Sequence, residues 1–229
     1  FRRMFGQLAK WVAQIDDAAR IPELVSHAFH TATAGRPGPV VLALPEDMLV
    51  ERTDTPDARP AVPVETGIGV EALARLRDLL SEAKRPLLLI GGGGWDAKAR
   101  ADIQAFAEAW EVPLTVSFRC QDYVDNDHTH YVGDVGIGPN PKLAERVKTT
   151  DLLVVLGARL GEMTTGGYTL LSLPVPAQRL VHIHAGAEEL GRVYQPELAI
   201  NANSAAVAAA LAGLAPAGDI QARQDWVRG

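Results

Sequence analysis

The sequence predicts an α/β fold with a Rossmann-like parallel sheet of about six strands and helices on both faces. Short runs such as Pro86–Ile90 and Asp151–Leu156 are apolar at nearly every position, which is typical of strands buried on both faces of a parallel sheet. These runs alternate with segments whose apolar residues recur at helical spacing. Alternating strands and helices indicate a parallel sheet that is covered on both sides.

The first fifty residues supply one helix and one strand. Apolar residues follow helical spacing over Ile21–Ala34, and Pro22 suits the first turn of that helix. The apolar run Val40–Leu44 then predicts a buried strand. We expect the apolar faces around Leu24, Phe29 and Val40–Leu44 to form an exposed patch of the kind that marks an interface.

Residues 51–66 change character, because three prolines lie among charged residues and threonines. This composition favours an extended linker. We therefore expect residues 1–50 to be the C-terminal piece of one domain and residues 67–214 to be a complete second domain. The polar residues 215–229 are expected to be another linker, toward a further domain.

Strands and helices alternate regularly through residues 67–214. Asp96 and Asn140 are suitable N-caps for two of the helices, whose buried faces follow helical spacing. The predicted strands are 86–90, 112–118, 151–156, 179–184 and 198–200. The predicted helices are 70–83, one from Asp96 to about Trp110, 141–148, a short one at 188–194, and 204–214, while 119–130 is a polar stretch.

The composition argues against several classes of partner. Charged residues make up 22% of the chain and the formal net charge is −6, so neither a nucleic acid nor a membrane is expected as a partner. No apolar run reaches the roughly 18 residues of a spanning helix. Residues 1–20 carry charges where a signal peptide has an apolar core. With the single cysteine Cys120, a cytoplasmic location is the default.

The glycine run Gly91–Gly94 lies between a strand and a helix, where parallel α/β sheets bind ligands. Glycines in such a turn let a phosphate approach the backbone, and the helix N-terminus supplies positive potential. Gly92-x-Gly94-x-x-Ala97 fits a loose dinucleotide fingerprint. However, strand 112–118 ends without the acidic residue that an NAD site needs. A tight turn that binds no ligand is the other interpretation.

Other candidate binding residues follow further strand ends. Arg159 leaves the end of a buried strand, where its guanidinium could hold a phosphate or a planar ring. An ion pair with a neighbour such as Glu162 is the alternative. The candidate cofactor-binding residues are Gly91, Gly92, Gly93, Phe118, Gly157, Ala158, Arg159, Thr164 and His184.

No catalytic residue and no metal ligand is predicted. His182 and His184 share one strand face, but no Cys or carboxylate completes the ligand set that a metal site needs. The chain has no Gly-x-Ser-x-Gly motif. A nucleophilic role for Cys120 would need a spatial contact with a histidine that the sequence does not show.

Four separated segments resemble, in order, parts of one known family. They are Gly35–Asp47, Arg85–Gly93, Asp151–Leu160, and Leu180–His184 together with Glu189–Gly191. They resemble the end of the pyrimidine-binding domain and then the central domain of thiamine diphosphate enzymes. Within this family, the chain resembles the acetolactate (acetohydroxyacid) synthase-like large subunits. Residues 1–50 would then be the C-terminal piece of a pyrimidine-binding domain, and 67–214 the central domain.

The resemblance implies a three-domain parent enzyme that acts on 2-oxo acids and assembles as a homodimer or tetramer. In this family thiamine diphosphate and Mg²⁺ are bound by the outer two domains. Both sites would lie outside this chain, which would be inert without the remaining domains of the parent. Gly133-Asp134-Val135 only partly matches the family's Gly-Asp-Gly motif, because its third residue is valine.

The resemblance also implies that this domain could hold FAD or ADP, as it does in some relatives. FAD-binding relatives carry aspartates where this chain has His184 and Gly186, and glycine offers no side chain to a ribose hydroxyl. We therefore expect weak or absent nucleotide binding and a structural, dimerising role for the domain. A stand-alone dinucleotide-binding oxidoreductase is the alternative.

Overall fold

The computed structural model describes residues 1–228, and the chain divides into two compact units, Phe1–Glu65 and Thr66–Gly229. The division falls within the segment that was expected to be a linker. Residues 51–69 contain no helix or strand, and most of their side chains are exposed. No helix of residues 1–228 is both long enough and apolar enough to cross a bilayer.

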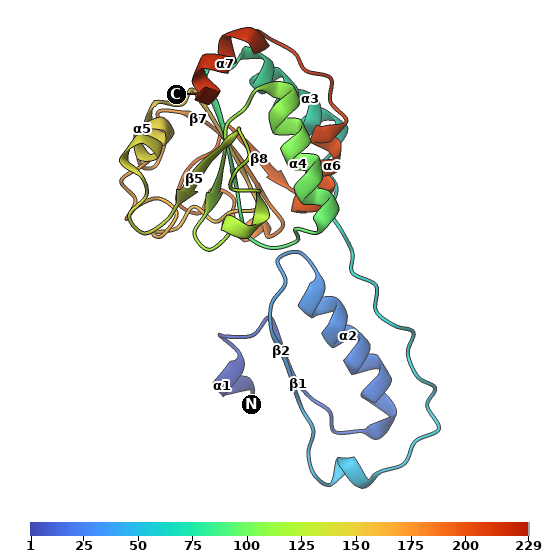
Figure 1. Ribbon diagram of the computed structural model, residues 1–229. Helices are drawn as coiled ribbons and strands as arrows, with labels where there is room; N and C mark the ends of the chain where they lie inside the picture. Colours follow the sequence, from blue (N-terminus) through green and yellow to red (C-terminus); the bar gives the residue numbers. More distant parts are fainter. Residues whose placement is uncertain (229) are drawn as a thin grey trace. The chain divides into compact units, whose positions relative to one another are not determined.

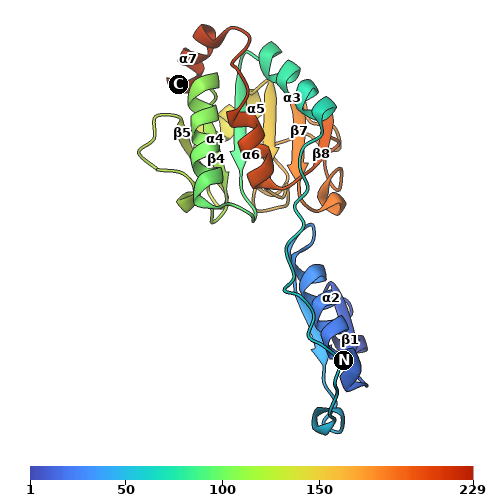
Figure 2. The ribbon, with the colours of Figure 1, turned by 90° about the vertical axis from the view of Figure 1, so that its right-hand side faces the viewer.

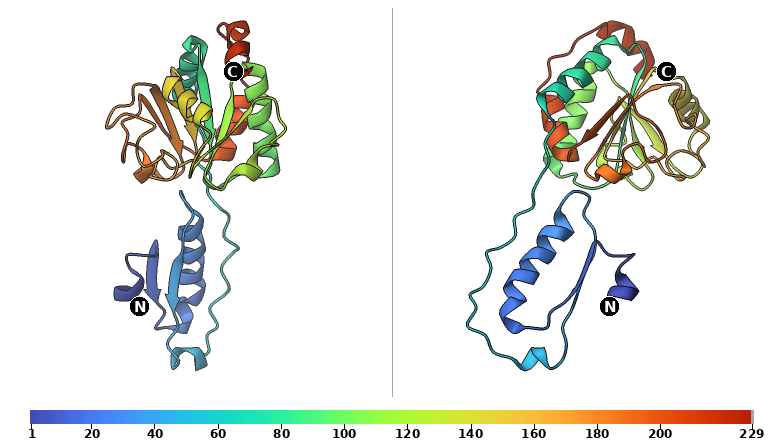
Figure 3. Two further views of the ribbon diagram at one scale, coloured as in Figure 1. Left: turned by 60° about the vertical axis from the view of Figure 1, so that its left-hand side comes forward. Right: turned by 180° about the vertical axis from the view of Figure 1, so that it is seen from behind.

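The first unit is a parallel pair of strands joined by one helix (Figure 3). Its elements are α1 (Arg2–Phe5), β1 (Trp11–Gln14), the 3-10 turn η1 (Ala18–Arg20), α2 (Ile21–Thr33), β2 (Val40–Ala43) and the 3-10 turn η2 (Met48–Val50). Leu24 is buried in a small core with Ile15, Ala18 and Met48, so its expected exposure was wrong. Phe29 is 60% exposed and lines a groove of about 570 Å³ between α2 and residues 57–61.

The second unit is built on a six-stranded sheet whose neighbouring strands are all parallel. Its strands are β3 (Pro86–Ile90), β4 (Leu114–Ser117), β5 (Tyr131–Val135), β6 (Leu152–Leu156), β7 (Arg179–His184) and β8 (Leu198–Asn201). They lie in the order β5-β4-β3-β6-β7-β8. The chain therefore builds outward from β3 and then outward from β6 on the other side, as in dinucleotide-binding sheets. The predicted Rossmann-like α/β fold is confirmed.

Helices cover both faces of this sheet, unequally. They are α3 (Val70–Glu82), α4 (Ala97–Trp110), α5 (Pro141–Thr149), α6 (Ser204–Ala212) and α7 (Ile220–Arg228), with the 3-10 turns η3 (Gln121–Tyr123) and η4 (Ala187–Glu189). Figures 1 and 2 show α3, α4 and α6 side by side on one face. The other face is covered by α5 and by long loops.

The two faces explain why the central strands are apolar throughout. Along β3, Leu88 and Ile90 belong to the core under α3, α4 and α6, whereas Leu87 and Leu89 belong to the core under α5. Successive side chains of a strand point to opposite faces. A strand with a core on each face therefore needs an apolar residue at every position.

Two elements of this unit differ from the expected ones. β5 follows the polar stretch 119–130 and was not predicted, because Gly133 and Asp134 interrupt its apolar pattern. Its position at the sheet edge leaves most of its residues only half-buried, so the strand does not need a continuous apolar run. The short helix expected at 188–194 is only the turn η4.

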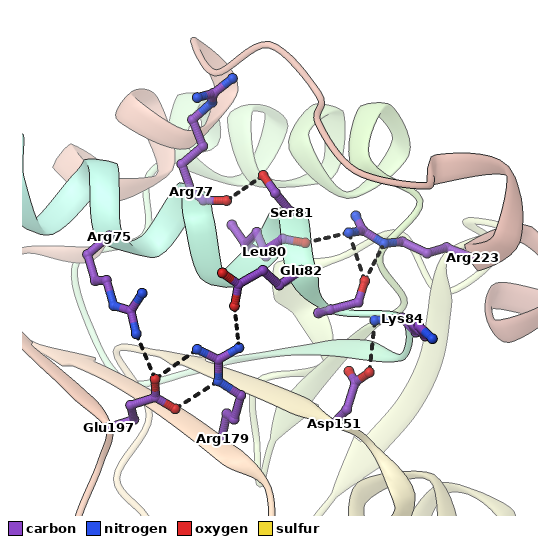
Figure 4. A network of polar contacts seen from close by, with 11 residues as sticks. Arg75, Arg77, Leu80, Ser81, Glu82, Lys84, Asp151, Arg179, Glu197 and Arg223 are labelled. Atoms are coloured by element: carbon purple, nitrogen blue, oxygen red, sulfur yellow. Dashed lines mark hydrogen bonds and ion pairs between the residues drawn. The ribbon is translucent and has the colours of Figure 1, made fainter.

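Residues 215–229 were expected to be a linker, but α7 packs against the second unit. The Arg223 side chain is fully buried and donates to the backbone carbonyls of Leu80, Ala83 and Trp110, at the ends of α3 and α4. Figure 4 shows the contact with Leu80. Trp226 Nε1 donates to Pro86 O at 2.7 Å. Because polar groups make these contacts, α7 lacks the apolar stripe from which a helix is predicted.

Candidate functional site

The carboxyl ends of the six parallel strands lie along one edge of the sheet. The segment that follows β3 leads to α4 on one face, whereas residues that follow β6 pack on the other face. Gly91 follows β3 and donates its N–H to Leu156 O at 3.1 Å. Gly157 follows β6 and donates to Ile183 O at 2.8 Å. Ligands of parallel α/β proteins bind at this point of divergence. The structure therefore brings the two predicted glycine turns together.

Three of these glycines are required by the packing of the two turns. A Cβ on Gly91 would overlap Ser117 Oγ, and Cβ atoms on Gly92 and Gly157 would each overlap a backbone carbonyl of the opposite turn. Gly92 and Gly157 also have φ angles of 69° and 76°, which favour glycine. Gly93 has no atom within 4 Å of its Cβ position. Gly93 is thus the one of these glycines in the run 91–93 at which a side chain would meet no other atom.

Two backbone carbonyls of the glycine run already accept hydrogen bonds from side chains of this chain. Trp95 Nε1 donates to Gly91 O at 2.9 Å, and Tyr123 Oη donates to Gly92 O at 2.6 Å. Burial raises the pKa of Tyr123, so its hydroxyl stays a donor at neutral pH. Asp96 caps α4 by accepting a backbone N–H at 2.7 Å. A phosphate at this helix N-terminus would meet the Asp96 carboxylate, which weakens the electrostatic attraction.

Arg159 forms an ion pair, as one of the two predicted alternatives stated, but its partner is not Glu162. Its Nε lies 2.9 Å from Oε1 of Glu189, and Arg192 approaches the same oxygen at 3.0 Å. The Glu189 side chain is only 6% exposed, whereas that of Arg159 is 46% exposed. A ligand phosphate would therefore compete with a carboxylate that already neutralises Arg159.

The two histidines of β7 are held by backbone groups. His182 Nε2 donates to Ala158 O at 3.0 Å, and burial lowers the pKa of His182. His184 Nδ1 lies 3.0 Å from both the backbone N and the backbone O of Gly186, and the tautomer of the ring decides whether it accepts from the N–H or donates to the carbonyl. The Glu188 carboxylate fills the space that a side chain at Gly186 would take. A carboxylate is therefore present at this edge despite the glycine.

Phe118 and Thr164 have other surroundings. Phe118 is half-buried, and the Arg119 guanidinium lies 5.0 Å from its ring centroid. Thr164 lines a small apolar cavity between the sheet and the loop that follows β6. Sequence reasoning missed Ser117, Trp95, Tyr123 and Glu189, which hold the predicted residues in place. Trp95 directly follows the glycine run, so its position was the one available signal.

Among residues 1–228, no three His, Cys, Asp or Glu side chains are grouped so that they could hold a metal ion. His128 and His130 pair instead with Glu108 and Glu111, at 2.7 and 3.0 Å. The partial motif that begins at Gly133 lies within the edge strand β5. The described residues therefore do not fit Mg²⁺ and the diphosphate that it would anchor.

Comparisons with known proteins show the family to which this chain belongs. The model for the thiamine pyrophosphate enzyme central domain matches residues 73–211. Glyoxylate carboligase from Escherichia coli O157:H7 is 28% identical over 227 residues, which are 96% of this chain and 38% of that protein. The large subunit of acetolactate synthase isozyme 1 from Escherichia coli K12 is 30% identical over 208 residues, or 90% and 36%.

The acetolactate synthase large subunit from Corynebacterium glutamicum is 28% identical over 222 residues, covering 91% of this chain and 34% of that protein. The chain thus spans little more than a third of the length of these relatives. The family model covers most of the second unit, from α3 to α6. The chain therefore belongs to the thiamine pyrophosphate enzyme family, and it contains that family's central domain.

Proposed function

We propose that the chain is a segment of a thiamine diphosphate- and Mg²⁺-dependent enzyme that forms or breaks carbon–carbon bonds of 2-oxo acids. The observation that carries this proposal is the family match over residues 73–211. It is supported by relatives named acetolactate synthase and glyoxylate carboligase, which align with at least 90% of the chain. Those names point to small 2-oxo acids as the substrate class.

The proposal assigns the chemistry to segments outside this chain. When bound, thiamine diphosphate would supply a nucleophilic carbon for addition to the 2-oxo group, and its cationic ring would take up the electron pair released on decarboxylation. The described residues hold no ligand set for its Mg²⁺. The role of residues 1–228 is then to fold, to join the outer domains and to support a homodimer or tetramer.

The test compares this chain with the product of the whole open reading frame that encodes it. Both proteins are incubated with pyruvate or glyoxylate, with and without thiamine diphosphate and Mg²⁺, while CO₂ release is measured. We expect cofactor-dependent release from the longer protein and none from residues 1–229 alone. Activity of the short chain, or no cofactor-dependent release with either substrate, would contradict the proposal.

We further propose that FAD and ADP bind weakly or not at all. This is supported by the packing role of Gly92 and Gly157, by the Arg159–Glu189 ion pair and by the backbone contact of His184. A ligand that selects the folded state raises Tm by mass action. A large Tm increase with micromolar FAD or ADP would contradict this proposal. The alternative of a stand-alone oxidoreductase is not favoured, because the family match is to the central domain.

A further inference from the structure

The helix α7 is attached to the second unit without belonging to either of its apolar cores. In the described part of this unit, the buried apolar clusters on the two faces of the sheet include no residue of Ile220–Arg228. The buried residues of α7 are Arg223 and Val227. α7 has 9 residues, and helices shorter than about 12–15 residues are marginal in water on their own. Contacts with the rest of the unit must therefore keep α7 folded.

The first set of contacts reaches one face of the sheet and is made by Arg223. Its guanidinium donates to Ala83 O at 2.9 Å and to Trp110 O at 3.1 Å, and it also donates to Leu80 O. These carbonyls lie at the C-terminal ends of α3 and α4, where backbone acceptors lack helical partners and a cation is favourable. One side chain of α7 thus caps two helices at once.

The second set of contacts reaches the other face and involves Trp226. Arg146 of α5 donates from Nη1 to Trp226 O at 2.7 Å, and its guanidinium lies 4.8 Å from the centroid of the Trp226 ring. Trp226 Nε1 donates to the carbonyl of Pro86, the first residue of β3. Because α5 packs on the opposite face from α3 and α4, α7 links the helices of both faces at the amino end of β3.

Docking of α7 takes two guanidinium groups out of water. Arg146 is 9% exposed and Arg223 is 0% exposed. Burial lowers the pKa of both arginines, because their charged forms lose hydration. Hydrogen bonds to carbonyls are needed to offset this cost, so docking of α7 gains less free energy than the burial of an apolar helix face. Segments with few buried apolar contacts are those that open locally in folded proteins.

We propose that α7 is a detachable strap, which leaves α3, α4 and α5 in one cooperative step while the six-stranded sheet stays folded. When docked, the strap ties the helices of both faces together at the amino end of β3. When detached, it unfolds, and the carbonyls at the ends of α3 and α4 become free. This inference concerns the second unit alone and does not depend on the reaction of the parent enzyme.

The test is native-state hydrogen exchange on the full chain, followed by NMR, with two indole N–H groups as probes. The Trp226 indole bonds to Pro86, outside the helix, so its exchange reports on detachment of the strap and not on fraying of its end. The Trp95 indole is the matched control, because it is buried in the core and bonds to Gly91 O. We expect protection factors of the α7 amides and the Trp226 indole to be at least about 100-fold lower than those of the Trp95 indole and the β3 amides.

A variant outside α7 tests the link to α5. Arg146→Ala removes a hydrogen bond and a ring contact without changing the sequence of the strap, so we expect the protection of the Trp226 indole to fall at least about tenfold. Lys148→Ala changes an exposed residue of the same helix and is expected to leave that protection unchanged. Equal effects of the two substitutions would contradict the role of Arg146 in holding the strap.

Two results on the wild-type protein would overturn the proposal. If the Trp226 and Trp95 indoles are equally protected, α7 opens only when the whole unit unfolds. If the α7 amides exchange rapidly while the Trp226 indole stays as protected as that of Trp95, the helix frays but does not detach. Both results come from the unsubstituted chain, so a variant that fails to fold leaves the test intact.

Discussion

Gly92 and Gly93 are neighbours in one turn, but only Gly92 lies where the packing and the backbone conformation exclude a side chain. A Cβ on Gly92 would strike the carbonyl of Gly157, and the φ of Gly92 is 69°. We expect Gly92→Ala to lower the free energy of unfolding by about 2–4 kcal/mol, because it combines a left-handed backbone with an overlap that only backbone movement relieves. Urea unfolding followed by circular dichroism measures this difference.

Gly93→Ala is the matched control for that substitution. No atom lies within 4 Å of its Cβ position, and its φ is outside the left-handed region. We expect a change within about 0.5 kcal/mol, as for most surface substitutions. Equal losses in the two variants would show that Gly92 has no special packing role.

His182 gives the molecule a pH dependence whose sign follows from its burial. Burial lowers the pKa of the folded-state ring below its ordinary value of 6.5. As pH falls through 6.5, the unfolded chain takes up a proton at this position, whereas the folded chain takes it up only at a lower pH, so the folded state loses stability. Between pH 7.5 and 5.5, we expect the free energy of unfolding to fall less in His182→Gln than in the wild type. The difference between the two slopes is at most about 1.4 kcal/mol per pH unit, the value for one titrating group.

Urea unfolding at a series of pH values measures this difference. His30→Gln is the matched control, since the His30 side chain is exposed on α2 and should leave the pH profile unchanged. If the profiles of the wild type and His182→Gln are parallel, His182 does not contribute to the pH dependence.

At the residue scale, the sequence shows which side chains leave strand ends but not what they contact. Arg159 was correctly placed after a buried strand, and an ion pair was one of its two alternatives. Its partner Glu189 follows a different strand, so only the sheet order brings the two together. The same limit applies to Gly186, whose missing side chain is replaced in space by Glu188.

At the scale of elements, α7 depends on one arginine more than on apolar contacts. Arg223 is fully buried and donates to carbonyls at the C-terminal ends of α3 and α4, where a cation is favourable. We expect Arg223→Ala to cost about 3 kcal/mol, because several buried carbonyls lose their partner at once. Thermal unfolding and limited proteolysis of α7 measure this effect.

Arg228→Ala provides a control on the same helix, because Arg228 is exposed. It should change neither Tm nor the rate at which α7 is cleaved. If Arg223→Ala leaves α7 as resistant to protease as the wild type does, the helix is held by its other contacts, such as those of Trp226.

Helices and strands could be predicted where burial requires an apolar residue at each position. β3 and β6 have a core on each face, so their apolar runs are unambiguous. β5 escaped prediction because an edge strand tolerates Gly133 and Asp134. α7 escaped because polar-to-backbone bonds replace an apolar stripe. β5 is an edge strand and α7 is the last helix of the second unit. Contacts with residues far away in the sequence, not the local pattern of apolar residues, hold these two elements in place.

For the whole molecule, regular alternation predicted the fold class, and four ordered motifs predicted the family. The linker composition of residues 51–66 lies where the chain divides into two units. The sequence does not reveal how unequal the two units are. In the first, Ile15, Ala18, Leu24 and Met48 form a small cluster of buried side chains, whereas the second has a core on each face of its sheet.

This inequality predicts that the two units differ in stability. β1 and β2 pair only with each other among the described strands, and a two-stranded sheet is marginally stable in water. In native-state hydrogen exchange on the full chain, we expect amides of β1 and β2 to exchange at least about 100-fold faster than those of β3 and β6. Such a ratio corresponds to about 3 kcal/mol less protection. The central strands of the second unit serve as the internal control. Equal protection of β1 and β3 would mean that both units unfold in one cooperative step, and the small core of the first unit would then be sufficient.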